Sequence, residues 1–434
     1  MISLLRVVDS KDSSNHNALE GAQLRVDLER IKRHILSLGE IGRNPADHGL
    51  YRMAFTDADM EAKRWLLDQI DGIGLESGSD GAGNIFGILR SGKKNPSLMI
   101  GSHIDTVPCA GTLDGSLGVV VGLECLRVMM EARVPLKQDV ELVAFCDEEG
   151  RFGGMLGSES FCGLTTPQTI QSARDTHGVS LKEAMLKQGM DAIKILEANR
   201  DPRSVDRYLE LHIEQGPVLD RQQLQVGIVD EITGLFRWNI RIQGESNHAG
   251  TTPMDMRRDA FMGLADFAHE IPRVLDEIGT ERSRATIGTA EILPGAANTV
   301  PGTVEFSFDV RDTSDEILYS LQDAFRRALS VICRKRSITF EFDEVSFIHP
   351  VKCDPLLVNK LAHHASVIGN DFTKMPSGAA HDAQIMGRLW PVAMIFVPSR
   401  QGMSHSPAEW TAWSDIEAGA NLMLQTLIDL AHPR

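Results

Sequence analysis

The 434-residue chain has no cysteine pair at CxxC spacing, no excess of basic residues and no long apolar run. Two of its six cysteines, Cys125 and Cys333, lie within helical apolar patterns, which is typical of reduced, buried thiols. A formal net charge of −16 argues against a nucleic-acid or anionic-membrane partner, since either requires a basic face. All apolar runs are shorter than the roughly 20 residues of a membrane span. The opening Met-Ile-Ser-Leu-Leu-Arg-Val-Val is too short for a signal-peptide core, and the polar stretch 9–17 after it resembles a frayed tail. We therefore expect a cytoplasmic protein.

Strands and helices alternate over residues 1–233 and again over residues 348–434. Apolar runs predict strands at 83–89, 97–104, 139–146, 208–212 and 392–397. Helical spacing predicts helices at 24–38, 118–130 and 355–369, one after the cap Thr56, and a last one whose Ser414 and Glu417 form a capping box. The chain is also longer than one hydrophobic core allows. These features predict an α/β domain with a largely parallel mixed sheet, built from both segments.

Residues 234–347 follow a different order. Strands are predicted at 235–244, 285–293, 302–312 and 338–347, with helices at 257–278 and 315–335. This βαββαβ order is that of a ferredoxin-like α+β module with its helices on one face of an antiparallel sheet. We expect an inserted domain, whose exposed face and edge would serve for dimerisation.

Four metal-favouring side chains stand where predicted elements begin or end, and a fifth, His405, lies in a polar loop after the predicted strand 392–397. Ligands collect at the carboxyl ends of strands in parallel sheets. Each residue alone has an ordinary structural alternative, because a lone histidine is more often a core residue and adjacent acids more often form a solvated turn. Their convergence favours a metal site, in which a bridging Asp114 would give each of two cations three ligands. The five are His103, Asp114, Glu149, His212 and His405.

Further polar residues suit the chemistry of such a site. Consecutive side chains at a strand end diverge, so Glu149 can bind a metal while Glu148 takes a proton from water. Asp105 can orient His103. In the second domain, His248 can stabilise an oxyanion and Arg311 can grip a carboxylate, although a surface salt bridge is the simpler alternative for Arg311. Asn298, before the third strand, is either a substrate contact or a turn residue.

Eight segments, in this order, resemble the amidases of the hydantoinase/carbamoylase family, a branch of the dinuclear-zinc aminoacylase and peptidase superfamily. The resemblance runs from about residue 24 to the C-terminus. The segments are Gly101-Ser-His-Ile-Asp, Leu113-Asp-Gly, Asp147-Glu-Glu-Gly, His212-Ile-Glu-Gln-Gly, Asn247-His-Ala-Gly-Thr-Thr-Pro-Met, Asn298-Thr-Val-Pro-Gly, Ser377-Gly-Ala-Ala-His-Asp-Ala and Ser404-His-Ser-Pro-Ala-Glu.

The resemblance implies specific roles. One ion would be held by His103, Asp114 and His212, and the other by Asp114, Glu149 and His405. Glu148 would be the general acid and base, with Asp105 supporting His103. The ions would be zinc, with manganese, cobalt and nickel as alternatives. A non-proline cis peptide would follow Asp114. The second domain would be a lid that dimerises and sends His248 into the neighbouring site. The implied substrate-binding residues are Gln215, His248, Asn298, Arg311, Gly378 and Ala379.

The implied reaction is hydrolysis of the carbamoyl C–N bond of an N-carbamoyl-L-amino acid or a related ureido acid such as 3-ureidopropionate. Ammonia and carbon dioxide would be released. Ala380 stands where the family usually has glycine, and residues 150–158 differ slightly from allantoate enzymes, which favours a carbamoylase. The alternatives are allantoate amidohydrolase, a dinuclear-zinc dipeptidase or aminoacylase, and a catalytically silent binding protein.

Overall fold

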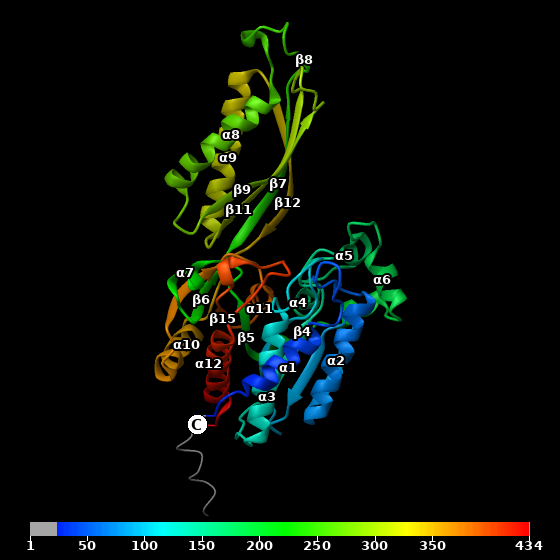
Figure 1. The fold of residues 1–434 in the computed structure, drawn as a ribbon, viewed down its shortest axis with the longest axis vertical. Helices are drawn as coiled ribbons and strands as arrows, with labels where there is room; N and C mark the ends of the chain where they lie inside the picture. Colours follow the sequence, from blue (N-terminus) through cyan, green and yellow to red (C-terminus); the bar gives the residue numbers. More distant parts are fainter. Residues whose placement is uncertain (1–23, 434) are drawn as a thin grey trace, which may run out of the picture.

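The computed structural model describes residues 24–433. Residues 1–23 of the predicted first domain, which include the predicted N-terminal tail, lie outside this range. Two sheets dominate the molecule (Figure 1). The nine-stranded sheet has the order β1 (Glu76–Ser79), β2 (Ile85–Leu89), β4 (Val140–Phe145), β3 (Ser97–His103), β5 (Val205–Ile213), β15 (Val392–Val397), β6 (Val226–Ile232) and β13 (Val351–Lys352), with β14 (Phe372–Ser377) paired to β6.

The four middle strands of this sheet, β4, β3, β5 and β15, run parallel to one another. Antiparallel pairs lie at both margins, where β1 and β2 flank β4 and where β6 and β13 follow β15. Every residue of β3, β4 and β15 is buried, as expected for continuous apolar runs covered on both faces. The predicted α/β fold with a parallel centre is confirmed.

Helices surround this sheet. The long helices α3, α12 and α10 form one continuous layer, with α1 against α3, while α4 and α11 pack together against β4, β5 and β15. Thr56 caps α2 as predicted, but α12 begins at Trp413 without a side-chain cap, so the predicted Ser414 capping box is wrong. The α-helices around the nine-stranded sheet are α1 (Leu28–Leu38), α2 (Asp57–Ile73), α3 (Ser116–Glu131), α4 (Leu156–Phe161), α5 (Pro167–Ser172), α6 (Leu181–Lys187), α7 (Val218–Gln222), α10 (Pro355–Ile368), α11 (Asp382–Met386) and α12 (Trp413–Ala431). Short 3-10 turns are η1 (Ala192–Glu197), η2 (Pro202–Ser204) and η4 (Arg400–Gly402).

The second sheet lies above the first in Figure 1 and has the order β12 (Thr339–Ile348), β7 (Gly234–Gln243), β11 (Thr303–Asp312) and β9 (Arg284–Leu293), all antiparallel. Helices α8 (Ala260–Ile278) and α9 (Asp315–Arg336) cover one face. Alternate residues of β7, among them Phe236, Trp238 and Ile240, point into a separate apolar cluster beneath these helices. The ribbon of β8 (Asn247–His248) and β10 (Thr299–Val300), with η3 (Met254–Met256), lies at the far end.

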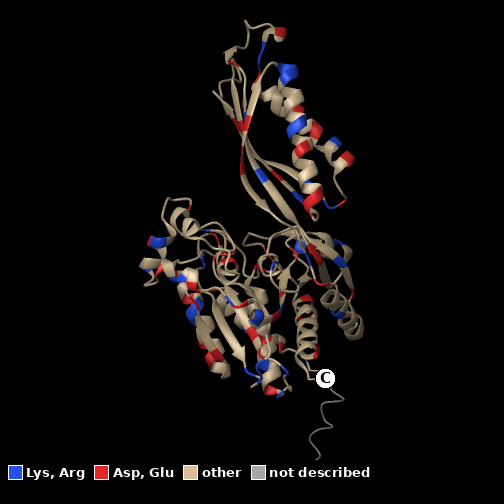
Figure 2. Cartoon of the chain, turned by 180° about the vertical axis from the view of Figure 1, so that it is seen from behind, with Lys and Arg blue, Asp and Glu red and all other residues tan. Residues whose placement is uncertain are grey.

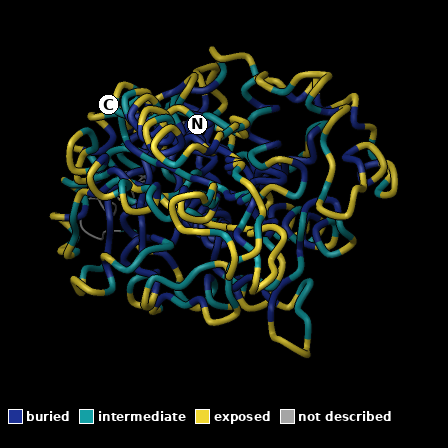
Figure 3. Tube along the Cα trace, turned by 90° about the horizontal axis from the view of Figure 1, so that it is seen from above, coloured by how far each residue is buried: buried dark blue, intermediate teal, exposed yellow. Residues whose placement is uncertain are grey.

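Strands β1, β6, β8, β10, β13 and β14 were not predicted. β13 is only two residues long, and the Phe372–Ser377 strand contains a lysine and a proline, so neither shows a clear apolar pattern. Acidic and basic residues are intermixed along the helices of both parts (Figure 2). Buried segments gather inside a rim of exposed loops (Figure 3). All six cysteines are described and free. Within residues 24–433 we find no helix with the length and apolar character needed to cross a bilayer.

Candidate metal centre

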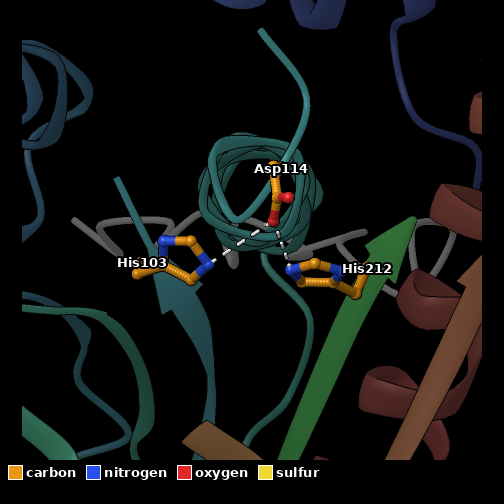
Figure 4. A group of neighbouring side chains, drawn as sticks. All are labelled: His103, Asp114 and His212. Atoms are coloured by element: carbon orange, nitrogen blue, oxygen red, sulfur yellow. Dashed lines mark ion pairs between the residues drawn. The ribbon is translucent and has the colours of Figure 1, made fainter. Parts of the chain in front are cut away.

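Three of the predicted ligands meet at the carboxyl ends of the parallel strands (Figure 4). His103 ends β3, His212 lies near the end of β5, and Asp114 precedes the first turn of α3. Asp114 Oδ1 lies 3.7 Å from His103 Nε2 and 3.2 Å from His212 Nε2. All three side chains are almost completely buried. The strand ends thus bring together side chains far apart in the sequence.

A second group uses the other oxygen of the same aspartate. Asp114 Oδ2 lies 3.3 Å from His405 Nε2, and His405 Nε2 lies 3.4 Å from Glu149 Oε2. Among the described residues, no group hydrogen-bonds to the buried Glu149 Oε1. Both groups have the composition and spacing of a metal site. Asp114 therefore belongs to both candidate groups.

Backbone carbonyls fix both buried imidazoles. His103 Nδ1 lies 3.0 Å from the Asp105 carbonyl, and His212 Nδ1 lies 2.9 Å from the Ile213 carbonyl. A carbonyl can only accept, so each Nδ1 carries a proton, and each Nε2 atom faces Asp114. Metal-binding histidines are usually oriented in this way. The donor set therefore fits a divalent cation.

The Asp105 carboxylate has a different position from the one expected. Its Oδ1 is 3.9 Å from His103 Nδ1, and instead its oxygens accept the backbone N–H groups of Glu148 at 3.3 Å and Glu149 at 3.2 Å. Burial, with Asp59 nearby, raises the pKa of Asp105 to about 7. Asp105 thus holds His103 through its carbonyl and the two adjacent glutamates through its side chain.

The centre concentrates acid groups away from water. Burial raises the pKa of Glu148 well above its usual value, and the neighbouring Glu149 raises it further. Burial, followed by the nearby charge of Asp114, also raises the pKa of Glu149 well above its usual value. Burial lowers the pKa of His103 to about 4. Burial also opposes ionisation of Asp114, but hydrogen bonds from His212 and His405 outweigh it and hold its pKa well below the usual value. Bound cations would compensate so many buried carboxylates.

Glu148 stands beside the first group. Its Oε2 lies 3.6 Å from His103 Nε2, while Glu149 turns toward His405. The two adjacent acids therefore face different ligands, which matches the expected divergence of consecutive side chains.

A third buried group was missed by sequence reasoning. Glu210, His212 and His381 lie close enough to share an ion, and the His381 ring centroid is 4.5 Å from that of His212. Glu210 precedes His212 by two residues on β5, a spacing that places both on one face. Its carboxylate is already bonded by Ser102, Tyr208 and the Ala383 N–H. Within this group, His381 contacts the His212 ring directly, while Glu210 is held by these three donors.

Glu409 was also missed, although it ends the Ser404 segment. It accepts the backbone N–H groups of Leu113 at 2.8 Å and Asp114 at 3.1 Å. Ser404 and Gln215 each donate to Asp114 Oδ2 at 2.8 Å. The loop that carries His405 therefore also holds Asp114 in place.

The remaining residues of the predicted substrate-binding set lie in two separate regions of the structure. Arg311 donates to the Gly378 carbonyl at 2.7 Å and to Asp309 at 2.9 Å, so Arg311, Gly378 and Ala379 lie together where the two sheets meet. His248 and Asn298 are exposed in the β8–β10 ribbon region, far from the metal ligands of the same chain (Figure 1). One chain does not bring these two residues to the centre.

One expectation from the resemblance is wrong. Within the described range, the single cis peptide bond joins Leu293 and Pro294, and the Asp114–Gly115 bond is trans. Gly115 has a φ of 61°, and a Cβ there would lie 2.3 Å from the His103 ring. Glycine at this position therefore allows the close approach without a cis bond.

Candidate metal-ligand groups beside a further acid, at the carboxyl ends of parallel strands, are typical of metal-dependent hydrolases. Residues 99–429 match the model of peptidase family M20/M25/M40, and the chain belongs to this family.

Several known proteins are similar to this chain over nearly its whole length. The chain is 36% identical over 409 residues to an N-carbamoyl-L-amino acid amidohydrolase of Geobacillus stearothermophilus, covering 93% of this chain and 98% of that one. It is 37% identical over 408 residues to an allantoate amidohydrolase of Bacillus subtilis, with 93% and 97% covered. A hydantoinase/carbamoylase family amidase from Burkholderia multivorans has a similar crystal structure, with TM-score 0.87, 29% identity, and 95% and 100% covered. The predicted resemblance and the assignment as a hydrolase are confirmed.

Proposed function

We propose that the chain is a metal-dependent amidohydrolase that cleaves the carbamoyl C–N bond of an N-carbamoyl-L-amino acid or a related ureido acid, releasing ammonia and carbon dioxide. The observation that carries this proposal is the position of Asp114 between two ligand sets, with Glu148 beside them. Relatives named for N-carbamoyl-L-amino acids and for allantoate support a ureido substrate. Allantoate is the second candidate, since the two kinds of relative have nearly equal identity.

Two divalent ions, zinc or else manganese, cobalt or nickel, would be held by the two ligand sets. His103, Asp114 and His212 would hold one, and Asp114, Glu149 and His405 the other. The Nε2 atoms that face Asp114 and the unpartnered Glu149 oxygen support this assignment. When bound, such ions lower the pKa of water and polarise a carbonyl.

Glu148 would move the proton. Burial raises the pKa of this carboxyl well above its usual value. A carboxylate at this position can accept a proton from the attacking water and return it to the leaving nitrogen. Asp105 would position Glu148 and Glu149 through their backbone N–H groups. His248 would stabilise the oxyanion that develops on the carbonyl.

Arg311 would bind the substrate carboxylate, together with Gln215, Asn298, Gly378 and Ala379. Replacing Arg311 with lysine keeps the charge but removes the planar fork that binds a carboxylate through two hydrogen bonds. We expect KM for a ureido acid to rise about tenfold or more, because charge-assisted hydrogen bonds contribute about 1.5–3 kcal/mol.

The matched control is Arg237→Lys, since Arg237 pairs with the same Asp309 at 2.9 Å. Steady-state kinetics of both variants decide the assignment. Equal KM values for the two variants would remove Arg311 from substrate binding.

The domains are proposed as 1–233 and 348–434 for the catalytic part and 234–347 for an inserted lid that forms a homodimer. The separate apolar cluster under α8 and α9 supports a distinct folding unit. The distance of His248 and Asn298 from the metal ligands supports the idea that each lid serves the partner's centre. A cytoplasmic location, supported by six free thiols, is part of the same proposal.

Complementation tests the shared site. Glu148→Gln and His248→Ala chains, each inactive alone, are co-expressed with different tags and the heterodimer is isolated. Because one of its two centres combines an intact Glu148 with an intact His248, we expect about half of the wild-type activity. A heterodimer as inactive as its parents would show that His248 does not cross between subunits.

The function itself is tested by a substrate panel. Metal-loaded protein is assayed for ammonia release from N-carbamoyl-L-amino acids, 3-ureidopropionate and allantoate, with dipeptides and N-acyl amino acids monitored for cleavage. Preferred ammonia release from a carbamoyl amino acid supports the main proposal, and preference for allantoate selects the second candidate. No turnover of any ureido substrate with any of the four metals would contradict both and favour a binding protein or a peptidase.

A further inference from the structure

The described chain passes between the two sheets only twice. The first crossing is Thr233, the single residue between β6 and β7, and the second is His349-Pro350, between β12 and β13. The crossings touch, because a Cβ on Gly234 would lie 2.5 Å from the Ile348 carbonyl oxygen and from the Pro350 ring. Any change in the orientation of the second sheet must therefore pass through this junction.

One buried side chain binds both crossings. Gln384 Nε2 donates to the Thr233 carbonyl and to the His349 carbonyl, each at 2.9 Å. Gln384 is only 1% exposed, and within the described residues its Oε1 has no hydrogen-bond partner. Reversing the amide would place its oxygen against two carbonyl oxygens, so both amide protons are committed to the crossings.

The segment that carries Gln384 also reaches the metal centre. His381, at the start of α11, packs its ring on His212, and the Ala383 N–H donates to Glu210 on the same strand at 2.9 Å. Just before α11, the Gly378 carbonyl accepts the hydrogen bond from Arg311 of the second sheet. Residues 377–386 therefore contact the metal-binding strand, the crossings and the second sheet.

From these contacts we infer that Gln384 is a positioning residue, which fixes the orientation of the second sheet relative to the metal ligands by holding both crossings. The inference rests on the proposed function, because the second sheet carries Arg311 and the β8–β10 ribbon at its far end carries His248 and Asn298, residues proposed to bind substrate. An error of about 1 Å in the placement of such residues can cost about 100-fold in rate. Hinge positions of this kind lie away from the chemistry but change its kinetics.

The test replaces Gln384 with methionine, which keeps the length of the side chain but removes both donors. The matched control is Gln138→Met, since Gln138 is also buried and donates to Asp206 at 3.1 Å within the first part of the fold. Nitroxide labels introduced through a genetically encoded amino acid at exposed Val331 on α9 and Leu36 on α1 report the separation of the two parts. Labelled chains are diluted with unlabelled chains so that only distances within a chain are measured.

We expect the wild type and Gln138→Met to give one narrow distance distribution and Gln384→Met to broaden it about twofold. In the metal-loaded protein, kcat/KM of Gln384→Met should fall about 100-fold at unchanged metal content. A purely structural role would instead lower the melting temperature and leave the distance distribution as in Gln138→Met, and that result would overturn the inference. If Gln384→Met fails to fold, Gln384→Asn, one methylene too short to reach both carbonyls, undergoes the same measurements. A wild type without ureido hydrolysis would refute the proposed function, while the distance comparison would still decide the role of Gln384.

Discussion

Replacing Glu148 with glutamine is expected to lower kcat by about 10²- to 10⁴-fold, the usual contribution of a general acid and base. Glutamine keeps the size and hydrogen-bonding capacity of the side chain but cannot take a proton from water. Glu148 Oε2 lies 3.6 Å from His103 Nε2, close to the first ligand set but outside both candidate groups. Metal content, measured by elemental analysis, should therefore equal that of the wild type.

The adjacent acid provides the matched control. Glu149 belongs to the second ligand set, so Glu149→Gln should lose bound metal as well as turnover. The two neighbouring substitutions thus separate proton transfer from metal binding. If Glu148→Gln kept near-normal turnover, or if it lost as much metal as Glu149→Gln, the role assigned to Glu148 would be wrong.

Replacing Asp114 with alanine should have the widest effect on metal binding. Both carboxylate oxygens are used, Oδ1 toward His103 and His212 and Oδ2 toward His405. Loss of a partner outside the coordination shell already weakens metal binding by about 10- to 100-fold. Loss of a shared ligand should therefore weaken both sites by more than about 100-fold and abolish turnover. Isothermal titration with zinc measures both affinities.

Two control variants show whether the loss of metal binding is specific to the shared ligand. His405→Ala removes a ligand of the second group alone, so one tight ion should remain. Asp323→Asn, an exposed carboxylate on α9, should bind metal as the wild type does. An Asp114→Ala chain that still held one ion as tightly as His405→Ala would contradict the bridging role.

The clustering of the candidate metal ligands was predictable from local patterns. Apolar runs identified β3, β4, β5 and β15, and parallel strands present their carboxyl ends at one edge, so residues at those ends had to meet. His103, Glu149 and His212 follow from this rule alone. His405 was predicted only from its loop and the need for another imidazole.

The contacts that hold these ligands were not predictable. Asp105 supports His103 through its carbonyl rather than its carboxylate, and Glu409 binds the Asp114 loop from a distance of 295 residues in the sequence. Such contacts depend on tertiary packing, which leaves no periodic signal in the sequence. Gln384 is a similar case, since its two acceptors are backbone carbonyls that carry no residue identity.

Anomalous diffraction at the zinc edge, from crystals grown with zinc, would show where the ions bind. We expect two peaks in each chain, one between His103, Asp114 and His212 and the other between Asp114, Glu149 and His405, on either side of the shared carboxylate. Peaks located elsewhere, or a centre that stays empty at saturating zinc, would contradict this expectation.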